Sequence, residues 1–543
     1  MEMNDSYRLA PPGVFLSPRR SWRYLHGAVF GLALACTMAL RPAWGAEALL
    51  WLEQGRPNAV ALQAVATLVR AADDGLDPRD YQADRLSAAL ALLADGPPLP
   101  AESAARLDGE LTLALQRYLT DLHAGRVDPR AIHADYRVAR PVPLDTAALL
   151  RDAVVRQRLP QALREAAPPV PLYPALRRTL AQYRTLAALP FWDSPLPPLP
   201  GRKLEPGQAW DGLELLIRRL GALGDLATDT PVPLLFEGAL VEGVRAFQAR
   251  HGIEPDGLIG RETLAQLAVS PAQRVRQIEL TMERLRWTPL LQGPRMVVVN
   301  VPEFVLRAYE WRDGRVQVRL ETRVIVGKAF KTRTPVFDEL MRLIEFSPYW
   351  NVPPSIARAE LVPRLRRDPG YFAAEGFEFV GGGQVSTELT SANLDAVLRG
   401  KMRIRQRPGP KNALGRIKFV FPNNDNIYLH DTSAPLLFQR ARRDFSHGCI
   451  RVEQPLALAQ FVLQDAPDWP AARIEAAMAA GTSSTLRLKE PLPVVIAYST
   501  VVVRGGRVYF YPDLYGHDGT LDLALRQRAL PASASRPAQG TAQ

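Results

Sequence analysis

One short segment, residues 427–452, gathers the side chains that can carry out covalent chemistry. It contains Cys449, with His447 two residues before it and His430 nineteen residues before it. A cysteine attacks a carbonyl as the thiolate, and near neutral pH a free cysteine is only slightly ionised. An imidazole within hydrogen-bond reach can take the thiol proton and later return one to a leaving amine. The segment therefore predicts acyl transfer by a cysteine with a histidine base.

Either histidine can be that base on the spacing alone. His447 is close to Cys449, and in an extended segment residues two apart project from the same face. His430 can instead reach the sulfur from a neighbouring strand. A further acceptor must then fix the tautomer of the base, as the third member of a catalytic triad does. The residues leave both assignments open.

The residues beside the thiol predict how the reacting groups are held. The backbone amides of Gly448 and Cys449 are natural oxyanion donors, and a glycine lets the main chain approach closely. Tyr428 would share a strand face with His430, where it is either a hydroxyl donor or a packed aromatic residue. Arg451 would either bind a substrate carboxylate in bidentate fashion or join a surface ion pair.

The composition limits the class of protein. The chain has 543 residues, of which 47% are apolar and 23% charged, which indicates several globular domains and excludes a wholly disordered or collagen-like chain. The net charge of +11 is spread along the chain and suits a polyanion such as nucleic acid, acidic lipid or a carboxylate-rich wall polymer. Only two cysteines, Cys36 and Cys449, are present, which excludes a disulfide framework.

The N-terminal residues predict export. Three arginines precede the apolar run Gly27–Leu40, which is shorter than the span of about 20 apolar residues that a membrane requires. Small residues follow this run, so we interpret residues 1–46 as a signal peptide, or as an N-terminal anchor if it is retained. Removal of the leader would leave Cys449 as a lone thiol in an oxidising compartment, where chemistry explains it better than packing.

The first half of the mature chain is expected to be helical. Residues 47–206 predict a scaffold domain, in which Ala59–Ala72 and Leu107–Leu119 place apolar residues at helical spacing. No catalytic constellation occurs in this part of the sequence. Residues 207–270 predict a small domain of three helices, at Leu213–Leu223, Ala239–Arg250 and Arg261–Leu267.

After Trp287 the pattern changes to β-branched alternation, which is typical of strands. We expect a mainly-β domain over residues 274–489, further strands over 490–530 and a disordered tail at 531–543. The expected strands include Arg295–Val301, Val305–Tyr309, Val316–Val326, Leu343–Phe346, Ile417–Phe421 and Ile427–His430, with a hairpin turn at Asp313-Gly314. The predicted fold class is therefore multidomain α+β.

A long insertion interrupts the expected β domain. Residues 347–415 include the segment YWNVPPS, a basic helical stretch and a run of three glycines, and we interpret them as a lid-like subdomain over a site. Trp350 and Asn351 are assigned to this lid as substrate-contacting residues, with a structural rather than a catalytic part.

Two families are similar to these segments. Phe247-Gln248, the run Asp256–Gly260 and Thr263 resemble the three-helix peptidoglycan-binding domain. Ser446-His447-Gly448-Cys449 with an upstream histidine resembles the signature of L,D-transpeptidases with the YkuD-type catalytic fold. Four further segments look like the large multidomain murein L,D-transpeptidases of Gram-negative envelopes: Met282–Trp287, Arg323–Gly327, Ser347–Ile356 and Phe421–Asp431.

This resemblance implies Cys449 as nucleophile and His430 as general base, with the backbone carbonyl of Asp431 or a neighbour orienting the ring. Ser446 and His447 then become site-shaping or substrate-contacting residues. The implied reaction transfers a tetrapeptide stem, with loss of D-alanine, to the side-chain amine of a diamino acid on a second stem. The product is a 3–3 cross-link in peptidoglycan. No metal or organic cofactor is required, because the thiol supplies the covalent step.

The same resemblance implies the surroundings of the protein. The expected location is the periplasm, or the inner membrane if the leader is retained as an anchor. Carbapenems are expected to acylate the same thiolate, and other cell-wall synthesis enzymes are open as further partners. No nucleic acid is expected, because export removes the opportunity and the basic run at 440–443 suits acidic wall polymer.

Three alternatives remain at this stage. Water can intercept the thioester, which would make the protein an L,D-carboxypeptidase that releases terminal D-alanine. His430, His447 and Cys449 are ligand types that suit zinc, although no paired-ligand spacing accompanies them. The chain can also be a wall-binding scaffold with an inactive catalytic domain, against which the intact cysteine and histidines count.

Overall fold

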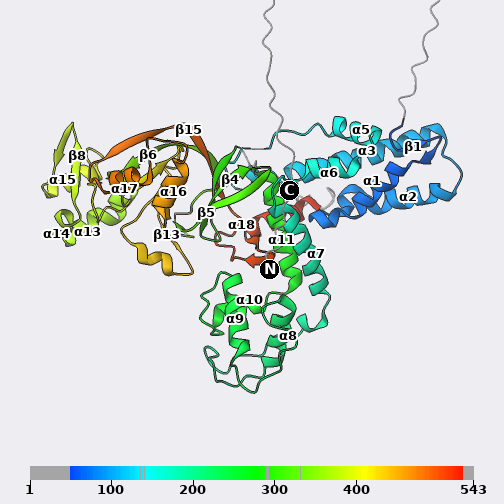
Figure 1. Ribbon diagram of the computed structural model, residues 1–543, viewed down its shortest axis with the longest axis horizontal. Helices are drawn as coiled ribbons and strands as arrows, with labels where there is room; N and C mark the ends of the chain where they lie inside the picture. The colour runs from blue at the N-terminus through cyan, green and yellow to red at the C-terminus, as the bar shows by residue number, and fades with distance from the viewer. Residues whose placement is uncertain (1–48, 134–135, 140, 289–292, 330–331, 530–543) are drawn as a thin grey trace, which may run out of the picture.

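The structure is a computed structural model that describes residues 49–133, 136–139, 141–288, 293–329 and 332–529. The expected leader at 1–46, with Cys36, and the expected tail at 531–543 lie outside the described residues. Figure 1 shows three arms, with a helical scaffold on the right, a three-helix domain at the bottom and a β domain on the left. The mixed helical and sheet architecture predicted from the sequence is confirmed. Across the described ranges, no helix combines the length and the apolarity that crossing a membrane requires.

The scaffold packs its helices around one hydrophobic core. Helix α1 begins after Asn58, whose side chain accepts a hydrogen bond from the Ala61 amide, and it buries Val60, Ala64 and Leu68 at helical spacing. The elements of the scaffold are β1 (Leu52–Glu53), β2 (Arg56–Pro57), α1 (Ala59–Val69), α2 (Ala83–Asp95), α3 (Ala101–Ala124), α4 (Pro129–Ile132), α5 (Thr146–Val155), α6 (Leu159–Ala166) and α7 (Leu172–Ala187).

The three-helix domain has the helices that the sequence predicts, α8 (Leu213–Leu223), α9 (Ala239–Arg250) and α10 (Arg261–Leu267). Buried Gln248 organises the turn after α9, because its amide nitrogen donates to Asp256 Oδ1 at 2.8 Å and its oxygen accepts from the Gly257 amide at 2.9 Å. The backbone of Leu204 pairs with that of Ile259. The domain therefore begins before residue 207, which is the start predicted from the sequence.

A central helix, α11 (Pro271–Trp287), belongs to two cores at once. It begins with a capping box between Ser270 and Gln273. Ile278 and Met282 lie in the scaffold core, whereas Trp287 lies in the core of the β domain. The expected start of the β domain at residue 274 is therefore wrong, because the helix that contains it serves both domains.

The β domain is a nine-stranded sheet in the order β13-β5-β14-β12-β11-β6-β15-β3-β4, with a further pairing of β4 with β5 that closes it. The predicted hairpin is confirmed, since β4 and β5 are joined by Asp313 and Gly314 with φ of 53° and 72°, as a tight primed turn requires. The strands are β3 (Arg295–Asn300), β4 (Val305–Arg312), β5 (Arg315–Gly327), β6 (Phe337–Phe346), β11 (Ile417–Val420), β12 (Leu429–His430), β13 (Asp444–Ser446), β14 (Ile450–Val452) and β15 (Ser484–Ala497).

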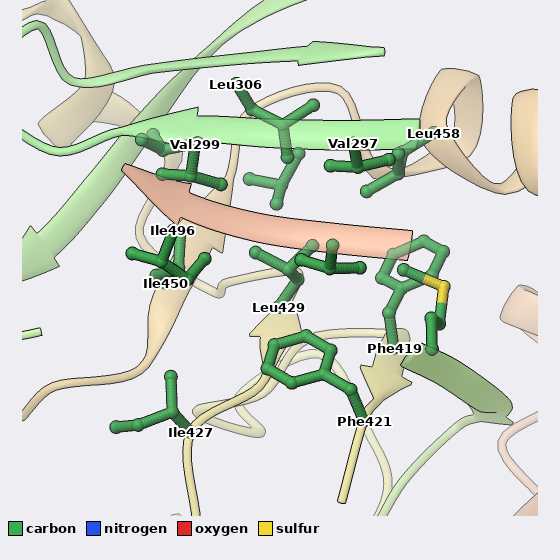
Figure 2. Close-up of a cluster of buried hydrophobic side chains, with 14 of the residues drawn as sticks. Val297, Val299, Leu306, Phe419, Phe421, Ile427, Leu429, Ile450, Leu458 and Ile496 are labelled. Atoms are coloured by element: carbon green, nitrogen blue, oxygen red, sulfur yellow. The ribbon is translucent and has the colours of Figure 1, made fainter. Parts of the chain in front are cut away.

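The inner face of this sheet is apolar. Figure 2 shows side chains from several strands meeting there, including Val297, Val299, Leu306, Phe419, Leu429, Ile450 and Ile496. Helices α16 (Pro455–Val462) and α17 (Ala471–Ala479) add Leu458 and Ile474 to the same core. Because side chains alternate along a strand, the residues on either side of Leu429 and Ile450 project from the opposite face.

The insertion is a subdomain with its own hydrophobic core and lies at the far left of Figure 1. Phe372 and Phe379 stack in this core with ring centroids 4.8 Å apart. Its four-stranded sheet has the order β7 (Trp350–Asn351), β10 (Arg403–Gln406), β8 (Phe377–Gly381) and β9 (Gln384–Ser386). Its helices are α12 (Pro354–Ile356), a π-helical turn at Ala357–Leu361, α13 (Val362–Arg367), α14 (Gly370–Ala374) and α15 (Ser391–Leu398).

Two sequence predictions for the C-terminal part differ from the structure: the boundary at 489–490 and the strands over 490–530. Strand β15 runs through the expected boundary at 489–490, because Pro491 falls at a register shift between Arg487 and Leu492 rather than at the end of a strand. After the hairpin of β16 (Val501–Arg504) and β17 (Arg507–Phe510), the chain forms helix α18 (His517–Ala529) instead of strands. Leu521 and Leu525, one helical turn apart, are buried in the β-domain core.

Candidate active site around Cys449

Three adjacent strands place the candidate residues on one face of the sheet. Strand β12 pairs in parallel with β14, so that His430 faces Arg451. On its other side β12 pairs with β11, where Lys418 faces His430. Register partners project on the same side, so these three side chains form a row across the sheet. The next row contains Tyr428 and Cys449.

The Cys449 thiol is half-buried and its nearest polar neighbours come from the segment before β12. Sγ lies 3.5 Å from the backbone carbonyl of Asn426. Burial raises the pKa of Cys449, while the backbone amide and hydroxyl of Tyr428, then Lys418 and Arg451, act to lower it. The net effect is a raised pKa, so the resting thiol is protonated at neutral pH.

His430 is buried, and its Nδ1 lies 2.5 Å from the backbone carbonyl of Asp431. Since a carbonyl only accepts, Nδ1 carries the proton in the neutral ring. Burial, followed by the nearby Arg451 guanidinium, lowers the pKa of His430 to about 3, although the carbonyls of Asp431 and Leu414 act to raise it. The imidazole is therefore neutral at neutral pH, with one nitrogen able to accept a proton.

The register places Tyr428, and not His430, directly across from Cys449. The Ile450 amide donates to the Tyr428 carbonyl at 3.0 Å, which fixes this alignment. In the described part of the chain, the thiol contacts the Asn426 carbonyl and Tyr428 rather than the imidazole. Of the two arrangements that the sequence left open, a His430 ring directly across from the sulfur is not the one seen, because His430 lies two residues further along the strand than Tyr428.

His447 does not share a face with Cys449. Gly448 between them has φ of 111°, which turns the chain, and a Cβ there would lie 3.1 Å from Ile427 Cδ1. The His447 side chain instead reaches the inserted subdomain, where its Nε2 lies 2.7 Å from Glu360 Oε1. His447 therefore connects the lid to the cysteine loop, which the assumption of an extended segment did not predict.

Ser446 holds the loop that carries the thiol. Its Oγ accepts a hydrogen bond from the Gly448 amide at 3.1 Å and donates to the Cys449 carbonyl at 2.5 Å. The Gly448 amide is thus already engaged, which corrects its prediction as an oxyanion donor. The Cys449 amide and the Tyr428 hydroxyl remain as candidates. Burial raises the pKa of Tyr428 far above its usual value, so this hydroxyl keeps its proton and can donate.

Arg451 is a half-buried cation for which the described residues supply no carboxylate partner. Among the described residues its guanidinium forms no ion pair, and its Nε is buried without a hydrogen bond. Burial lowers the pKa of Arg451, and the neighbouring Cys449 acts to raise it. Within the part of the chain that the structure describes, Arg451 does not form the surface ion pair considered from the sequence. An unpaired guanidinium beside the thiol is chemically suited to a carboxylate.

The two lid residues, Trp350 and Asn351, lie in the sheet of the inserted subdomain. Trp350 packs in the core of the insertion, with its ring centroid 6.4 Å from that of Phe377, whereas Asn351 is exposed. Both belong to β7, which pairs with β10. The hydrogen bonds of the described ranges join neither residue to Cys449, so the structure gives Trp350 a packing role.

Sequence reasoning missed two residues of the site, Lys418 and Glu360. Lys418 interrupts the buried strand residues Ile417 and Phe419, and this alternation is a signal that its side chain leaves the core. Glu360 carried no signal, because its contact with His447 spans 87 residues of sequence. As for the zinc alternative, the described residues contain no group of three or more His, Cys, Asp or Glu side chains arranged to hold a metal ion.

Comparison with known proteins identifies this domain. Residues 294–496, which include the nine-stranded sheet and the cysteine loop, match the family model "L,D-transpeptidase catalytic domain". The chain therefore contains an L,D-transpeptidase catalytic domain. Residues 45–180 match a model described as "Scaffold domain", and residues 211–267 match "Putative peptidoglycan binding domain". The L,D-transpeptidase domain thus includes all but one residue of β15, past the boundary at 489 that the sequence suggested.

A curated relative agrees with this assignment. A protein of Haemophilus influenzae named "Putative L,D-transpeptidase" is 32% identical over 250 residues, which is 46% of this chain and 49% of that protein. The chain thus spans about half the length of the curated relative that it matches. The resemblance to L,D-transpeptidases and to peptidoglycan-binding domains that the sequence suggested is confirmed at the level of these domains.

Proposed function

We propose that the protein is an L,D-transpeptidase of the periplasm that forms 3–3 cross-links in peptidoglycan, with Cys449 as its nucleophile. One observation carries the proposal. On a single sheet face, a half-buried thiol lies beside the Tyr428 hydroxyl, in a cluster with neutral, buried His430 and unpaired Arg451. This face supplies a nucleophile, a donor, a base and a cation for a substrate carboxylate.

The first step is acylation of the cysteine. Sγ of Cys449 bonds to the carbonyl carbon of the third residue of a tetrapeptide stem while the thiol proton passes to His430. The ring then gives that proton to the leaving D-alanine amine as the C–N bond breaks, and a thioester remains. Because the thiol pKa is raised and that of His430 is about 3, the proton moves with the attack and no thiolate–imidazolium pair exists at rest.

The imidazole and the oxyanion need support during this step. The Asp431 carbonyl, 2.5 Å from Nδ1 of His430, stabilises the ring when it becomes positively charged. The Tyr428 hydroxyl and the Cys449 amide are the donors for the oxyanion, at which charge develops. The carbonyl and both donors belong to this chain. The proton transfer requires the imidazole of His430 to come within hydrogen-bond distance of the sulfur when the donor stem is bound.

The second step resolves the thioester. The side-chain amine of a diamino acid on a second stem attacks the acyl carbon, the new amide forms, and sulfur leaves as thiolate. His430 takes a proton from the amine and returns it to the sulfur, which restores the resting state. Water in place of the amine would give an L,D-carboxypeptidase, and the two reactions differ only in the acceptor.

The rest of the chain supports binding of a wall polymer. The three-helix domain matches a peptidoglycan-binding model, and the net charge of +11 suits a polymer that carries carboxylates. Arg451 would hold a stem carboxylate beside the thiol. Residues 1–46 would direct export to the periplasm, and carbapenems would acylate Cys449 in place of the donor stem.

Defined disaccharide tetrapeptides test the proposal. The full chain is incubated with them and the products are resolved by mass. Dimers that have lost one alanine support transfer, whereas tripeptides alone identify the carboxypeptidase and no product identifies an inactive scaffold. Cys449→Ala should give neither product, and dimers formed by this variant at the parental rate would refute the mechanism.

Carbapenem capture is a second, independent measurement. Intact mass after incubation with a carbapenem should increase by one drug molecule in the parent protein and not in Cys449→Ala. Labelling that survives in the variant would place the nucleophile elsewhere.

A further inference from the structure

A lysine and a glutamate extend the row formed by His430 and Arg451. Lys418 on β11 faces His430, and Glu345 on β6 faces Lys418. Lys418 Nζ lies 3.1 Å from Glu345 Oε2, and the side chains are only 17% and 27% exposed. The ion pair is therefore built into the face that carries the thiol, unlike a pair on a solvated surface.

The same ammonium lies over an aromatic ring. Lys418 Nζ is 4.4 Å from the centroid of the Tyr428 ring, within the range of a cation–π interaction. The hydroxyl of that ring contacts the sulfur of Cys449. Glu345, Lys418, Tyr428 and Cys449 thus form a continuous chain of contacts from strand β6 to the thiol.

We propose that Lys418, held by Glu345, is a positioning residue that fixes the Tyr428 ring against Cys449 and supplies positive charge that stabilises the thiolate. The inference rests on the proposed role of Cys449 as nucleophile. Lys418 does not touch the reacting atoms, so it acts through Tyr428 and through its field.

The charges around the thiol support this role. Lys418 lowers the pKa of Cys449 in the same direction as Arg451, and it also helps to keep His430 neutral. Glu345 acts in the opposite sense on this face, where it contributes to the raised pKa of Tyr428. From the inserted subdomain, Glu360 contacts His447, two residues before Cys449.

The opposite charges of Lys418 and Glu345 give a decisive test. Lys418→Met and Glu345→Gln break the same ion pair, but the first removes a cation near the thiol and the second removes an anion. A purely structural pair predicts the same effect from both variants. A positioning role in which charge stabilises the thiolate predicts opposite effects.

The measurement is the rate of Cys449 alkylation by iodoacetamide as a function of pH, followed by intact mass. Lys418→Met should raise the apparent pKa of Cys449 by about one unit and slow alkylation near neutral pH about tenfold. Glu345→Gln should lower that pKa and speed alkylation. Lys418→Arg, which keeps the cation over the ring, should restore most of the parental profile.

Three outcomes would overturn the inference: a Lys418→Met profile that superimposes on the parent, shifts of the same sign in both variants, or Glu345→Gln that slows alkylation. Lys489→Met, at an exposed lysine of β15, is the matched control and should change nothing. Thermal melts establish folding, and if Lys418→Met does not fold the other two variants decide. Alkylation reads the thiol directly, so failure of transpeptidation with a normal alkylation profile would refute the proposed function alone.

Discussion

Two arginines of the chain, buried Arg286 and half-buried Arg451, have contrasting surroundings. On α11, Arg286 is fully buried against the scaffold, and its terminal nitrogens lie 3.1 Å from Glu283 Oε2 and 2.6 Å from the Tyr173 hydroxyl. On β14, Arg451 has no such partner among the described residues. A buried charge that is paired within the chain fixes the geometry of the fold, whereas one left unpaired costs stability and suits a ligand.

Two buried histidines make a related comparison. In the three-helix domain, His251 stacks on Phe247 at 3.8 Å, with Phe510 at 5.7 Å on the side of the C-terminal hairpin. Burial lowers the pKa of His251 as it does that of His430. Only His430 shares a sheet face with a thiol. A lowered histidine pKa therefore marks burial, and the neighbours decide whether it marks catalysis.

The largest effect is expected at the base. His430→Ala should reduce kcat/KM for cross-linking by about 10²- to 10⁴-fold, because it removes the proton acceptor. His447→Ala should cost much less, since His447 contacts the lid rather than the thiol. Steady-state rates with tetrapeptide donors measure both, and loss in the second variant without loss in the first would reverse the assignment.

Arg286, the arginine that is paired within the chain, should contribute to the stability of the fold. Arg286→Met leaves Glu283 with only Arg126 as a charged partner in a buried site, so we expect a loss of about 3–5 kcal/mol in the free energy of unfolding. Arg451→Met is the matched variant and should not lower stability, since it removes a charge that has no partner among the described residues. Urea denaturation of both proteins measures the difference, and equal losses would erase the contrast between the two arginines.

Substrate binding should depend on Arg451 rather than on Arg286. Arg451→Met should lower kcat/KM by about 10- to 100-fold, because a charge-assisted hydrogen bond contributes about 1.5–3 kcal/mol. Arg451→Lys should recover only part of this, since a lysine lacks the planar fork. A stem with its terminal carboxylate amidated tests the reason: the parent should lose activity on it and Arg451→Met should lose little more. Equal discrimination by both proteins would argue against a carboxylate at Arg451.

The smallest expected effect is on the stability of the fold at acid pH. Burial lowers the pKa of His251, and those of His430 and His517 to about 3, so these rings stay neutral in the fold while the unfolded chain binds protons below about pH 6.5. Stability should therefore fall as the pH drops through this window, by about 1.4 kcal/mol per pH unit for each histidine. Urea titrations at several pH values give the slope of the unfolding free energy against pH. His251→Phe should reduce this slope by the equivalent of one proton, and an unchanged slope would show that His251 titrates normally.

Local patterns predicted much of this molecule. The three helices of the peptidoglycan-binding domain follow from apolar spacing, and the Asp313-Gly314 turn follows from residues that tolerate a positive φ. Cys449 and His430 stand out because few side chains can do their chemistry. Such features depend on neighbours in sequence, which are available without the fold.

Long-range register was not available from the sequence. Whether His430 or Tyr428 lies across from Cys449 depends on a shift of two residues between β12 and β14, which periodicity cannot fix. The contact of Glu360 with His447 depends on how the insertion folds back. The continuity of β15 across the expected boundary at 489–490 was not available either, because it depends on a register shift against β6 at which the sheet accommodates Pro491.

The position of helix α11 in two hydrophobic cores has a consequence for the proposed function. Its side chains are shared between the scaffold core and the β-domain core, while Arg250 of the three-helix domain donates to the Val508 carbonyl in the C-terminal hairpin at 2.8 Å. The three-helix domain and the β domain are thus both attached to the central part of the molecule, one through the C-terminal hairpin and the other through α11. If the proposed function holds, this attachment would keep a bound wall polymer at a fixed distance from Cys449.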